Sequence, residues 1–316
     1  MISKGKVGLS MVWVLCVVVA LSFVAVPKGP SFAVEKWKAG VSLPLLNVFY
    51  LPFMRALRQA VEEAGGECIW AEAGGYQVPK ELQNVENMVV QGIDVLFIDA
   101  CDSVASAPAI REANRAGIPV VGLNQRVPDV DMVTVVASDN YGAGKIAAEH
   151  LARKLNGKGN ILLINGPPVT AVLDRIRAFK DVIEKYPAMR IVGEQMAKND
   201  MADCLYVAEN LLSAHPDANG FLCMNDYAFL GAYTALQGLG KEKEVIITSI
   251  DALPDVVQLL ATGEAGDSGT AAQFPIHIAR AAIQAYLDYK TGKEVSPFIK
   301  VKVEMITEEN AAGFHW

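Results

Sequence analysis

The chain has 316 residues, of which 52% are hydrophobic and 20% are charged, and its formal net charge is −7. This composition is typical of a well-packed globular protein with one large or two medium domains, and it excludes a disordered chain. An acidic surface argues against nucleic acid as a partner, because that binding depends on Lys and Arg contacts with phosphates. It also argues against an anionic membrane surface.

Residues 1–33 differ from the rest of the chain. MISKGK is basic, VGLSMVWVLCVVVALSFVAV is continuously apolar, and PKGPSFA ends in small residues. This order predicts a secretory signal peptide cleaved after Ala33, with an uncleaved membrane anchor as the alternative. Cys16 follows Leu15 rather than Gly or Ala, so it does not fit a lipoprotein site. Without the three lysines of this segment, 25 Lys and Arg and 35 Asp and Glu remain, a net charge of −10.

Four cysteines follow Ala33: Cys68, Cys101, Cys204 and Cys223. Each lies in or beside an apolar run, and none forms a CxxC pair. We therefore expect free thiols, with a Cys204–Cys223 disulfide as the alternative.

Short apolar runs alternate with amphipathic stretches of helical spacing from residue 39 onward. Three of the predicted helices cover about residues 55–66, 80–92 and 110–117, with Gly pairs or single glycines at their ends. This alternation predicts βαβ units and parallel sheets, an α/β fold. Ten strands are too many to pack around a single hydrophobic core, so we expect two lobes. The division between them is expected near residues 138–140. The predicted strands are 39–46, 67–73, 94–100, 119–124, 133–139, 160–166, 190–197, 220–225, 245–251 and 267–273.

Polar side chains follow most of these strands. In an open parallel sheet, ligands bind beyond the carboxyl ends of the strands, so these residues are the candidates for a binding site. They are Asn47 with Phe49 and Tyr50, Asp99 with Asp102, Asn124 with Gln125 and Arg126, Ser138 to Asn140, Asn225 with Asp226, Asp251, and Gln273.

This set of side chains suits a neutral ligand rich in hydroxyl groups. Carboxamides and carboxylates satisfy hydroxyls, and aromatic rings pack on the C–H face of a sugar. Structural alternatives stay open: Asn47, Asn225 or Asp251 could cap helices, and Phe49 or Phe53 could pack in the core.

Catalytic signatures are missing from the sequence. The four histidines are scattered without metal-ligand spacing, and no GxSxG, P-loop or GxGxxG motif follows a strand. Asp99 and Asp102 could suggest acid–base work, but a DACD segment before a helix is typical of turns and caps. We therefore expect no enzyme, no metal and no cofactor.

Several stretches resemble segments of the periplasmic ribose-type sugar-binding proteins. The segment VASDNYGAGKIAAEHLARKL resembles the family's crossover and the helix that follows it. The segment FLCMNDYAFLGAYTALQGLG resembles the family's NDxxAxGAxxAL helix. The family's NPFF or NPFY ligand-contact segment is similar to NVFYLPFMRALRQAVEEAG, and its VVxxDR strand end to VVGLNQR. Its later Asp and Gln contacts resemble IDALPDVVQLLATGE and GTAAQFP. The likeness runs from about residue 37 to the end.

The resemblance implies the type I periplasmic binding protein fold, in which a three-stranded hinge joins two Rossmann-like lobes with parallel sheets. It implies a first lobe of residues 34–137 plus about 274–297, and a second lobe of 138–273 plus about 298–316. The ligand would lie between the lobes. We add Ser138 and Asn199, which end two strands, to the residues implied by the family: Asn47, Phe49, Tyr50, Asn124, Gln125 or Arg126, Asn225, Asp251 and Gln273.

Three departures from the family pattern bear on the ligand. Leu173 falls where the first, sugar-contacting Arg of an Arg-x-Arg pair is expected, and Arg175 keeps only the second. Asn199 lies where an aromatic residue is common, and Asn124 replaces an Asp. The second-lobe wall is therefore expected to be less aromatic and less cationic. The ligand could be a pentose, a hexose, a polyol or a furanose signal molecule.

The resemblance implies a monomeric periplasmic protein that captures a sugar or polyol by hinge closure and delivers it to the permease of an ABC transporter. The alternative is a binder that feeds a chemoreceptor or sensor. A transcriptional repressor with the same core would need a basic helix-turn-helix before residue 37, where this chain has the predicted signal peptide. A periplasmic enzyme on a similar scaffold would turn over its bound sugar.

Overall fold

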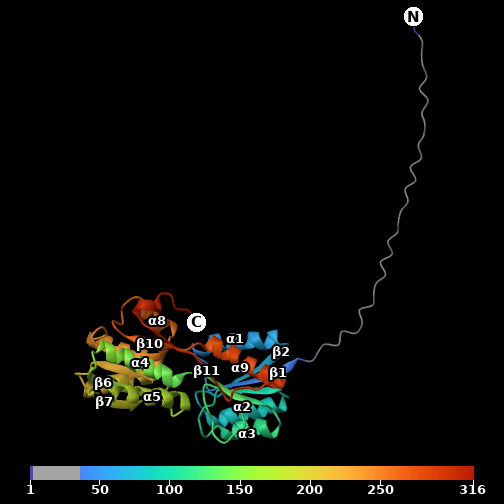
Figure 1. The fold of residues 1–316 in the computed structure, drawn as a ribbon, viewed down its shortest axis with the longest axis horizontal. Coiled ribbons are helices and arrows are strands. Elements are labelled where there is room, and N and C mark those ends of the chain that lie inside the picture. The colour runs from blue at the N-terminus through green and yellow to red at the C-terminus, as the bar shows by residue number, and fades with distance from the viewer. Residues whose placement is uncertain (3–35) are drawn as a thin grey trace. The chain divides into compact units, whose positions relative to one another are not determined.

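The computed structural model describes residues 1–2 and 36–316 (Figure 1). Lys36–Trp316 forms one compact unit. The predicted signal peptide, its cleavage site at Ala33 and Cys16 lie outside the described residues. Within the described ranges, no helix combines the length and the apolar character needed to cross a membrane.

The compact unit contains two six-stranded sheets, as the alternation of strands and helices predicted. The first sheet has the strand order β11-β5-β4-β3-β1-β2, and all its strand pairs are parallel. Its strands are β1 (Trp37–Leu43), β2 (Gly66–Glu72), β3 (Val95–Ile98), β4 (Val120–Leu123), β5 (Thr134–Ser138) and β11 (Phe298–Val301).

The second sheet has the order β12-β10-β9-β8-β6-β7 and is parallel except for the pair of β10 with β12. Its strands are β6 (Lys158–Asn165), β7 (Ala188–Met196), β8 (Gly220–Cys223), β9 (Ile246–Asp251), β10 (Gly269–Ala272) and β12 (Glu304–Ile306).

Helices cover both sheets and define two lobes. In the first lobe, α1 and α9 pack together over one core cluster, and α2 and α3 pack together over another. The first-lobe helices are α1 (Tyr50–Glu63), α2 (Val78–Val90), α3 (Ala107–Arg115) and α9 (Pro275–Lys290). The second-lobe helices are α4 (Asn140–Lys154), α5 (Thr170–Ile183), α6 (Met201–Ala214), α7 (Asp226–Leu239), α8 (Pro254–Ala261) and α10 (Glu308–Ala311).

The central strands are buried along their whole length, which explains why they read as continuous apolar runs. The predicted helix stops Gly92 and Gly117 have φ of 72° and 71°, a left-handed conformation that glycine adopts without strain. The four cysteines after Ala33 are free thiols.

The chain passes between the lobes three times: from β5 to α4, from β10 to α9, and from β11 to β12. One predicted boundary is wrong, because residues 298–316 do not all belong to the second lobe. Phe298–Val301 (β11) pairs with β5 in the first sheet, and only the chain from β12 onward joins the second lobe. β11 and β12 were not predicted, because each has at most four residues and both carry charged side chains.

Two glycines of α7 make a matched test of the packing. A Cβ on Gly231 would lie 2.6 Å from the backbone N of Leu205 on α6, whereas a Cβ on Gly238 would meet no atom within 4 Å. We expect Gly231→Ala to lower the free energy of unfolding by about 1–3 kcal/mol, since the facing backbone must shift.

Gly238→Ala should leave stability unchanged or raise it by about 0.5–1 kcal/mol, because alanine favours the helix. Urea unfolding of both variants measures the difference. Equal stability of the two variants would contradict the close approach of α6 and α7.

Candidate ligand-binding site

A cavity between the lobes is lined by residues at the carboxyl ends of strands from both sheets. Its free volume is about 60 Å³, which holds only a few water-sized groups, so the lobes lie close together. The first lobe contributes Asn47, Phe49, Tyr50, Tyr76, Asn124 and Gln125. The second lobe contributes Val169, Ala171, Val172, Arg175, Asn199, Asn225, Tyr227, Asp251 and Gln273. We call this the central cavity.

Nine of the eleven residues predicted for the site line the central cavity. The other two, Arg126 and Ser138, do not, and line a second cavity described below. For these two residues the prediction that they face the central cavity is wrong. Arg126 follows a tight bend at Gln125, where the Gln125 N–H donates to the Leu123 carbonyl, and its side chain extends toward α5.

The loop between β1 and α1 forms an aromatic wall. The rings of Phe49 and Tyr50 lie edge to face with centroids 5.3 Å apart, and both side chains are buried. Phe53, the alternative core residue, is also buried, one helical turn further on. Asn47 does not occupy the N-cap position of α1, which is Phe49; its Oδ1 accepts a 3.3 Å hydrogen bond from the Tyr50 N–H.

A buried carboxylate supports this wall from behind. Asp99 follows β3, is 1% exposed, and accepts 2.7 Å hydrogen bonds on Oδ2 from the Tyr50 hydroxyl and from Asn124 Nδ2. Burial raises the pKa of Asp99 to about 7. The DACD segment was expected to stabilise a turn, and only Asp102 does so. Its Oδ1 accepts hydrogen bonds from the N–H groups of Val104 and Ala105.

The second-lobe wall is built on helix starts and strand ends. Asn225 is the N-cap of α7, as one alternative proposed: its Oδ1 accepts from the Ala228 N–H at 3.1 Å. Its Nδ2 donates to Asn199 Oδ1. The Asn225 side chain therefore caps α7 and lines the cavity at the same time. Asp251 is not a cap, because the N-cap of α8 is Leu253.

Arg175 is the cation of the central cavity, which corrects the expectation of a less cationic wall. Its Nη1 lies 3.7 Å from Asp251 Oδ1, and its Nε donates to Asn140 Oδ1 at 2.9 Å. Burial raises the pKa of Asp251, whereas the neighbouring Arg175 lowers it. Leu173, two residues earlier on α5, is 49% exposed and does not line the cavity.

The strained turn after β9 holds Asp251 in place. Asp251 and Ala252 have φ of 139° and 61°, unusual for residues other than glycine. Buried Asp226 accepts from the Leu253 N–H at 2.6 Å and from the Thr270 hydroxyl at 2.7 Å, which fixes this turn. Gln273 Nε2 donates to Asp251 Oδ1 at 2.6 Å.

Direct hydrogen bonds join the two lobes around the cavity. The Ala171 N–H donates to Gln125 Oε1 at 3.1 Å, and Asn199 Nδ2 donates to the Tyr76 hydroxyl at 3.3 Å. The Thr170 N–H donates to Ser103 Oγ at 2.7 Å. The N-terminus of α5 therefore contacts the first lobe, and this arrangement of the lobes is closed.

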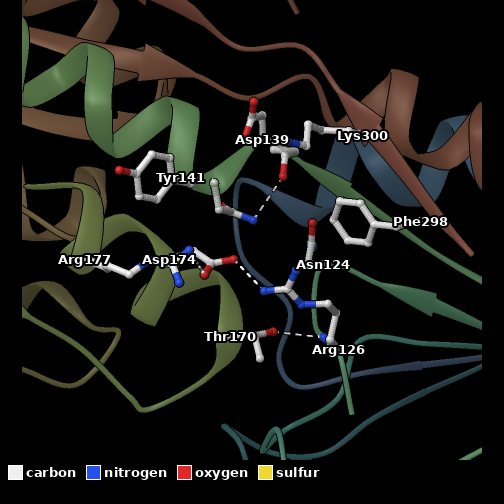
Figure 2. Close-up of a pocket in the computed structure, with 11 residues that line it drawn as sticks. Asn124, Arg126, Asp139, Tyr141, Thr170, Asp174, Arg177, Phe298 and Lys300 are labelled. Carbon is white, nitrogen blue, oxygen red and sulfur yellow. Dashed lines mark hydrogen bonds and ion pairs between the residues drawn. The ribbon is translucent and has the colours of Figure 1, made fainter. Parts of the chain in front are cut away.

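A second cavity of about 290 Å³ lies beside the crossover from β5 to α4, and we call it the hinge-side cavity (Figure 2). Arg126 of the first lobe forms a 2.7 Å ion pair with Asp174 of α5, and its backbone N–H donates to Thr170 Oγ1 at 2.9 Å. Lys300 of β11 lies 3.3 Å from Asp139. The charges of this cavity are largely paired with one another.

Six residues that line the central cavity were not among those predicted for the site: Tyr76, Val169, Ala171, Val172, Arg175 and Tyr227. Tyr76 follows β2 with φ of 63°, behind the turn of Gly74 and Gly75. Tyr227 lies in the first turn of α7 and supplies an aromatic ring to the second lobe, where the sequence predicted few. The strand-end rule could have found Tyr76, since it follows the second predicted strand.

Residues 36–316 contain no group of three or more His, Cys, Asp or Glu side chains that could hold a metal ion. The cavity itself carries one Arg and one Asp, close enough to offset each other. Its remaining polar groups are carboxamides and tyrosine hydroxyls.

Comparison with known families identifies this architecture. Residues 40–294 match the family model described as "Periplasmic binding protein domain". The chain belongs to this family. The ribose import binding protein of Escherichia coli is 31% identical over 266 residues, which cover 84% of this chain and 88% of the relative. The ribose import binding protein of Bacillus subtilis is 29% identical over 277 residues, which cover 87% and 88%.

Solved structures of the family have the same fold. An arabinose-transporter periplasmic binding protein from Shewanella sp. ANA-3, bound to L-arabinofuranose, matches with a TM-score of 0.81 and 27% identity, covering 87% of this chain and 93% of that one. A solute-binding protein from Bacillus halodurans with bound myo-inositol matches with a TM-score of 0.81 and 25% identity, covering 88% and 96%. The predicted type I periplasmic binding protein fold is confirmed.

The raised pKa of Asp99 predicts a pH-dependent stability. Between the ordinary pKa of 3.8 and about 7, the unfolded chain releases the Asp99 proton while the folded protein keeps it, so rising pH lowers the stability of the wild type. An amide at position 99 does not titrate. The unfolding free energy of Asp99→Asn relative to wild type should therefore rise by about 2–3 kcal/mol from pH 5 to pH 8.

Urea unfolding at both pH values measures this difference. Asn87→Ala, an exposed change on α2, is the control, and its difference from wild type should stay constant because no titrating group is removed. A pH-independent difference for Asp99→Asn would contradict a buried carboxyl group with a raised pKa behind the cavity.

Proposed function

We propose that this protein captures a small, neutral, polyhydroxylated ligand, a sugar or a polyol, between its lobes. The observation that carries the proposal is the lining of the central cavity: one Arg–Asp pair, Arg175 with Asp251, among carboxamides and tyrosines from both lobes. A paired charge leaves no net attraction for an ionic ligand, whereas carboxamides satisfy hydroxyl groups in both directions.

The site residues fall into two roles in this proposal. The rings of Phe49 and Tyr227 would pack against the apolar face of the ligand, one from each lobe. Its hydroxyl groups would form hydrogen bonds with the carboxamides of Asn47, Asn124, Asn225 and Gln273. The Arg175 Nη2 atom has no hydrogen-bond partner among the described residues, so it would donate to a ligand oxygen.

Hinge closure would link ligand binding to the arrangement of the two lobes. A ligand that contacts both lobes stabilises the closed arrangement by the free energy of those contacts. The three chain passages near residues 138–140, 272–275 and 301–304 would serve as the hinge. No bond is made or broken in this mechanism.

The destination of the ligand follows from the family. The relatives are named as import binding proteins, and we propose that the closed protein delivers its ligand to the permease of an ABC transporter in the periplasm. Removal of residues 1–33 after export would leave a soluble, monomeric carrier. Delivery to a chemoreceptor is the alternative.

A thermal-shift panel tests the proposal. The processed chain from Val34, unfolded and refolded to remove any carried ligand, is heated with D-ribose, D-allose, L-arabinose, myo-inositol or the anionic D-gluconate. A neutral compound at about 100 times its Kd adds about 2.7 kcal/mol, a shift of at least about 5 °C, while D-gluconate adds none.

The shift should disappear in Asn47→Ala and in Asn225→Ala, one residue from each lobe, and should persist in the exposed control Asn87→Ala. A response to D-gluconate alone, or to no compound at all, would contradict a neutral sugar or polyol site.

The ion pair in the hinge-side cavity predicts a measurable contribution to closure. Arg126 is half exposed, and its ion pair with Asp174 joins the two lobes in this closed arrangement, so Arg126→Ala should weaken binding of the panel's best ligand about two- to fivefold. Arg177→Ala is the matched control, because Arg177 pairs with Asp174 within α5.

Calorimetric titration in low salt measures both Kd values. In about 1 M salt the deficit of Arg126→Ala should vanish, because exposed charges are screened. An equal loss in the two variants would show that the pair between the lobes does not stabilise closure.

A further inference from the structure

Asp99 makes no direct contribution to the lining of the central cavity, yet it binds two residues that do. It is 1% exposed, and its Oδ2 atom accepts hydrogen bonds from the Tyr50 hydroxyl and from Asn124 Nδ2, each 2.7 Å long. Tyr50 and Asn124 both line the cavity. Asp99 therefore influences any ligand through these two side chains.

The Asn124 amide nitrogen can only donate a hydrogen bond, and Asp99 Oδ2 accepts from it and from the Tyr50 hydroxyl. The Tyr50 hydroxyl has one proton and uses it toward Asp99. Because Asn124 Nδ2 donates to Asp99, Oδ1 is the amide atom that remains for another partner. Asn124 Oδ1 is buried and has no hydrogen-bond partner among the described residues.

The backbone holds Asn124 at the same time. Its φ of 55° is left-handed, a conformation that Asn tolerates better than most residues, and its N–H donates to the Val136 carbonyl at 3.0 Å. A buried oxygen without a partner is unfavourable, so binding of a ligand group that donates to it is favoured. At the first-lobe end of the cavity, Tyr50 thus uses its one hydroxyl proton on Asp99, and Asn124 keeps an acceptor oxygen without a donor.

We propose that Asp99 is a positioning residue that makes this end of the cavity select for a hydrogen-bond donor on the ligand. The inference rests on the proposed function and makes it more specific. The ligand must present a free hydroxyl hydrogen to Asn124 Oδ1. A derivative that is deoxygenated or O-methylated at that position leaves the oxygen unpaired and is rejected.

A double-mutant cycle on Asp99 and Asn124 tests the inference. D-ribose, D-allose and myo-inositol are the probes, and calorimetry gives Kd for wild type, Asp99→Ala, Asn124→Ala and the double variant. Each single change should weaken the probe that wild type binds at least tenfold, because each removes the oriented acceptor. The double variant should be no more than about threefold weaker than Asn124→Ala, since Asp99 acts through Asn124.

Asp99→Asn separates positioning from a general structural role. An amide oxygen in the place of Oδ2 still accepts from both Tyr50 and Asn124, so this variant should bind within about threefold of wild type. Asp102→Asn, in the adjacent turn, is the control and should bind as wild type does. Asp99→Leu keeps the branched shape of the side chain without its oxygens, and it replaces the alanine variant if that one does not fold.

The outcomes distinguish this inference from the proposed function. A wild-type protein that binds none of the three probes would overturn both. Wild-type binding that persists unchanged in folded Asp99→Ala or Asp99→Leu would overturn the inference alone. So would losses that multiply in the double variant, because they would mean that Asp99 and Asn124 act independently.

Discussion

The buried pair of Arg175 and Asp251 is the interaction on which the rest of the site depends. A single buried charge costs several kcal/mol, and removal of one partner from a buried pair costs about 3–5 kcal/mol. Here Asn140, Gln273 and the strained turn after β9 hold the two groups 3.7 Å apart. The pair gives the cavity polar character without net charge, which is why a neutral ligand fits it.

The two lobes contribute unequally to recognition. In the first lobe, Asp99 orients Tyr50 and Asn124 from behind, so that side offers acceptors. In the second lobe, the guanidinium of Arg175 offers donors, and Asn225 and Asn199 are bonded to each other. If Asn124 and Arg175 bind the ligand as we propose, the ligand would donate to Asn124 Oδ1 in the first lobe and accept from Arg175 in the second. This polarity fixes how a sugar or polyol ring would be oriented when the lobes close.

Much of this site could be predicted because the sheet topology determines where it lies. In a parallel sheet the carboxyl ends of all strands lie at the same edge. A correct strand assignment was therefore enough to place Asn47, Asn225 and Gln273 in the site. Helix positions needed more. Leu173 and Arg175 lie two residues apart on α5, so they point to nearly opposite sides, and only the structure shows which one faces the cavity. Similarly, β11 was missed because a four-residue edge strand carries too weak a pattern.

Closure around a ligand is the central claim, and small-angle X-ray scattering tests it most directly. The processed chain from Val34, refolded without ligand, is measured before and after saturation with the sugar or polyol that it binds. Hinge closure predicts a smaller radius of gyration in the saturated protein, with a scattering curve that matches the closed structure of residues 36–316. An unchanged radius of gyration at saturation would contradict hinge closure.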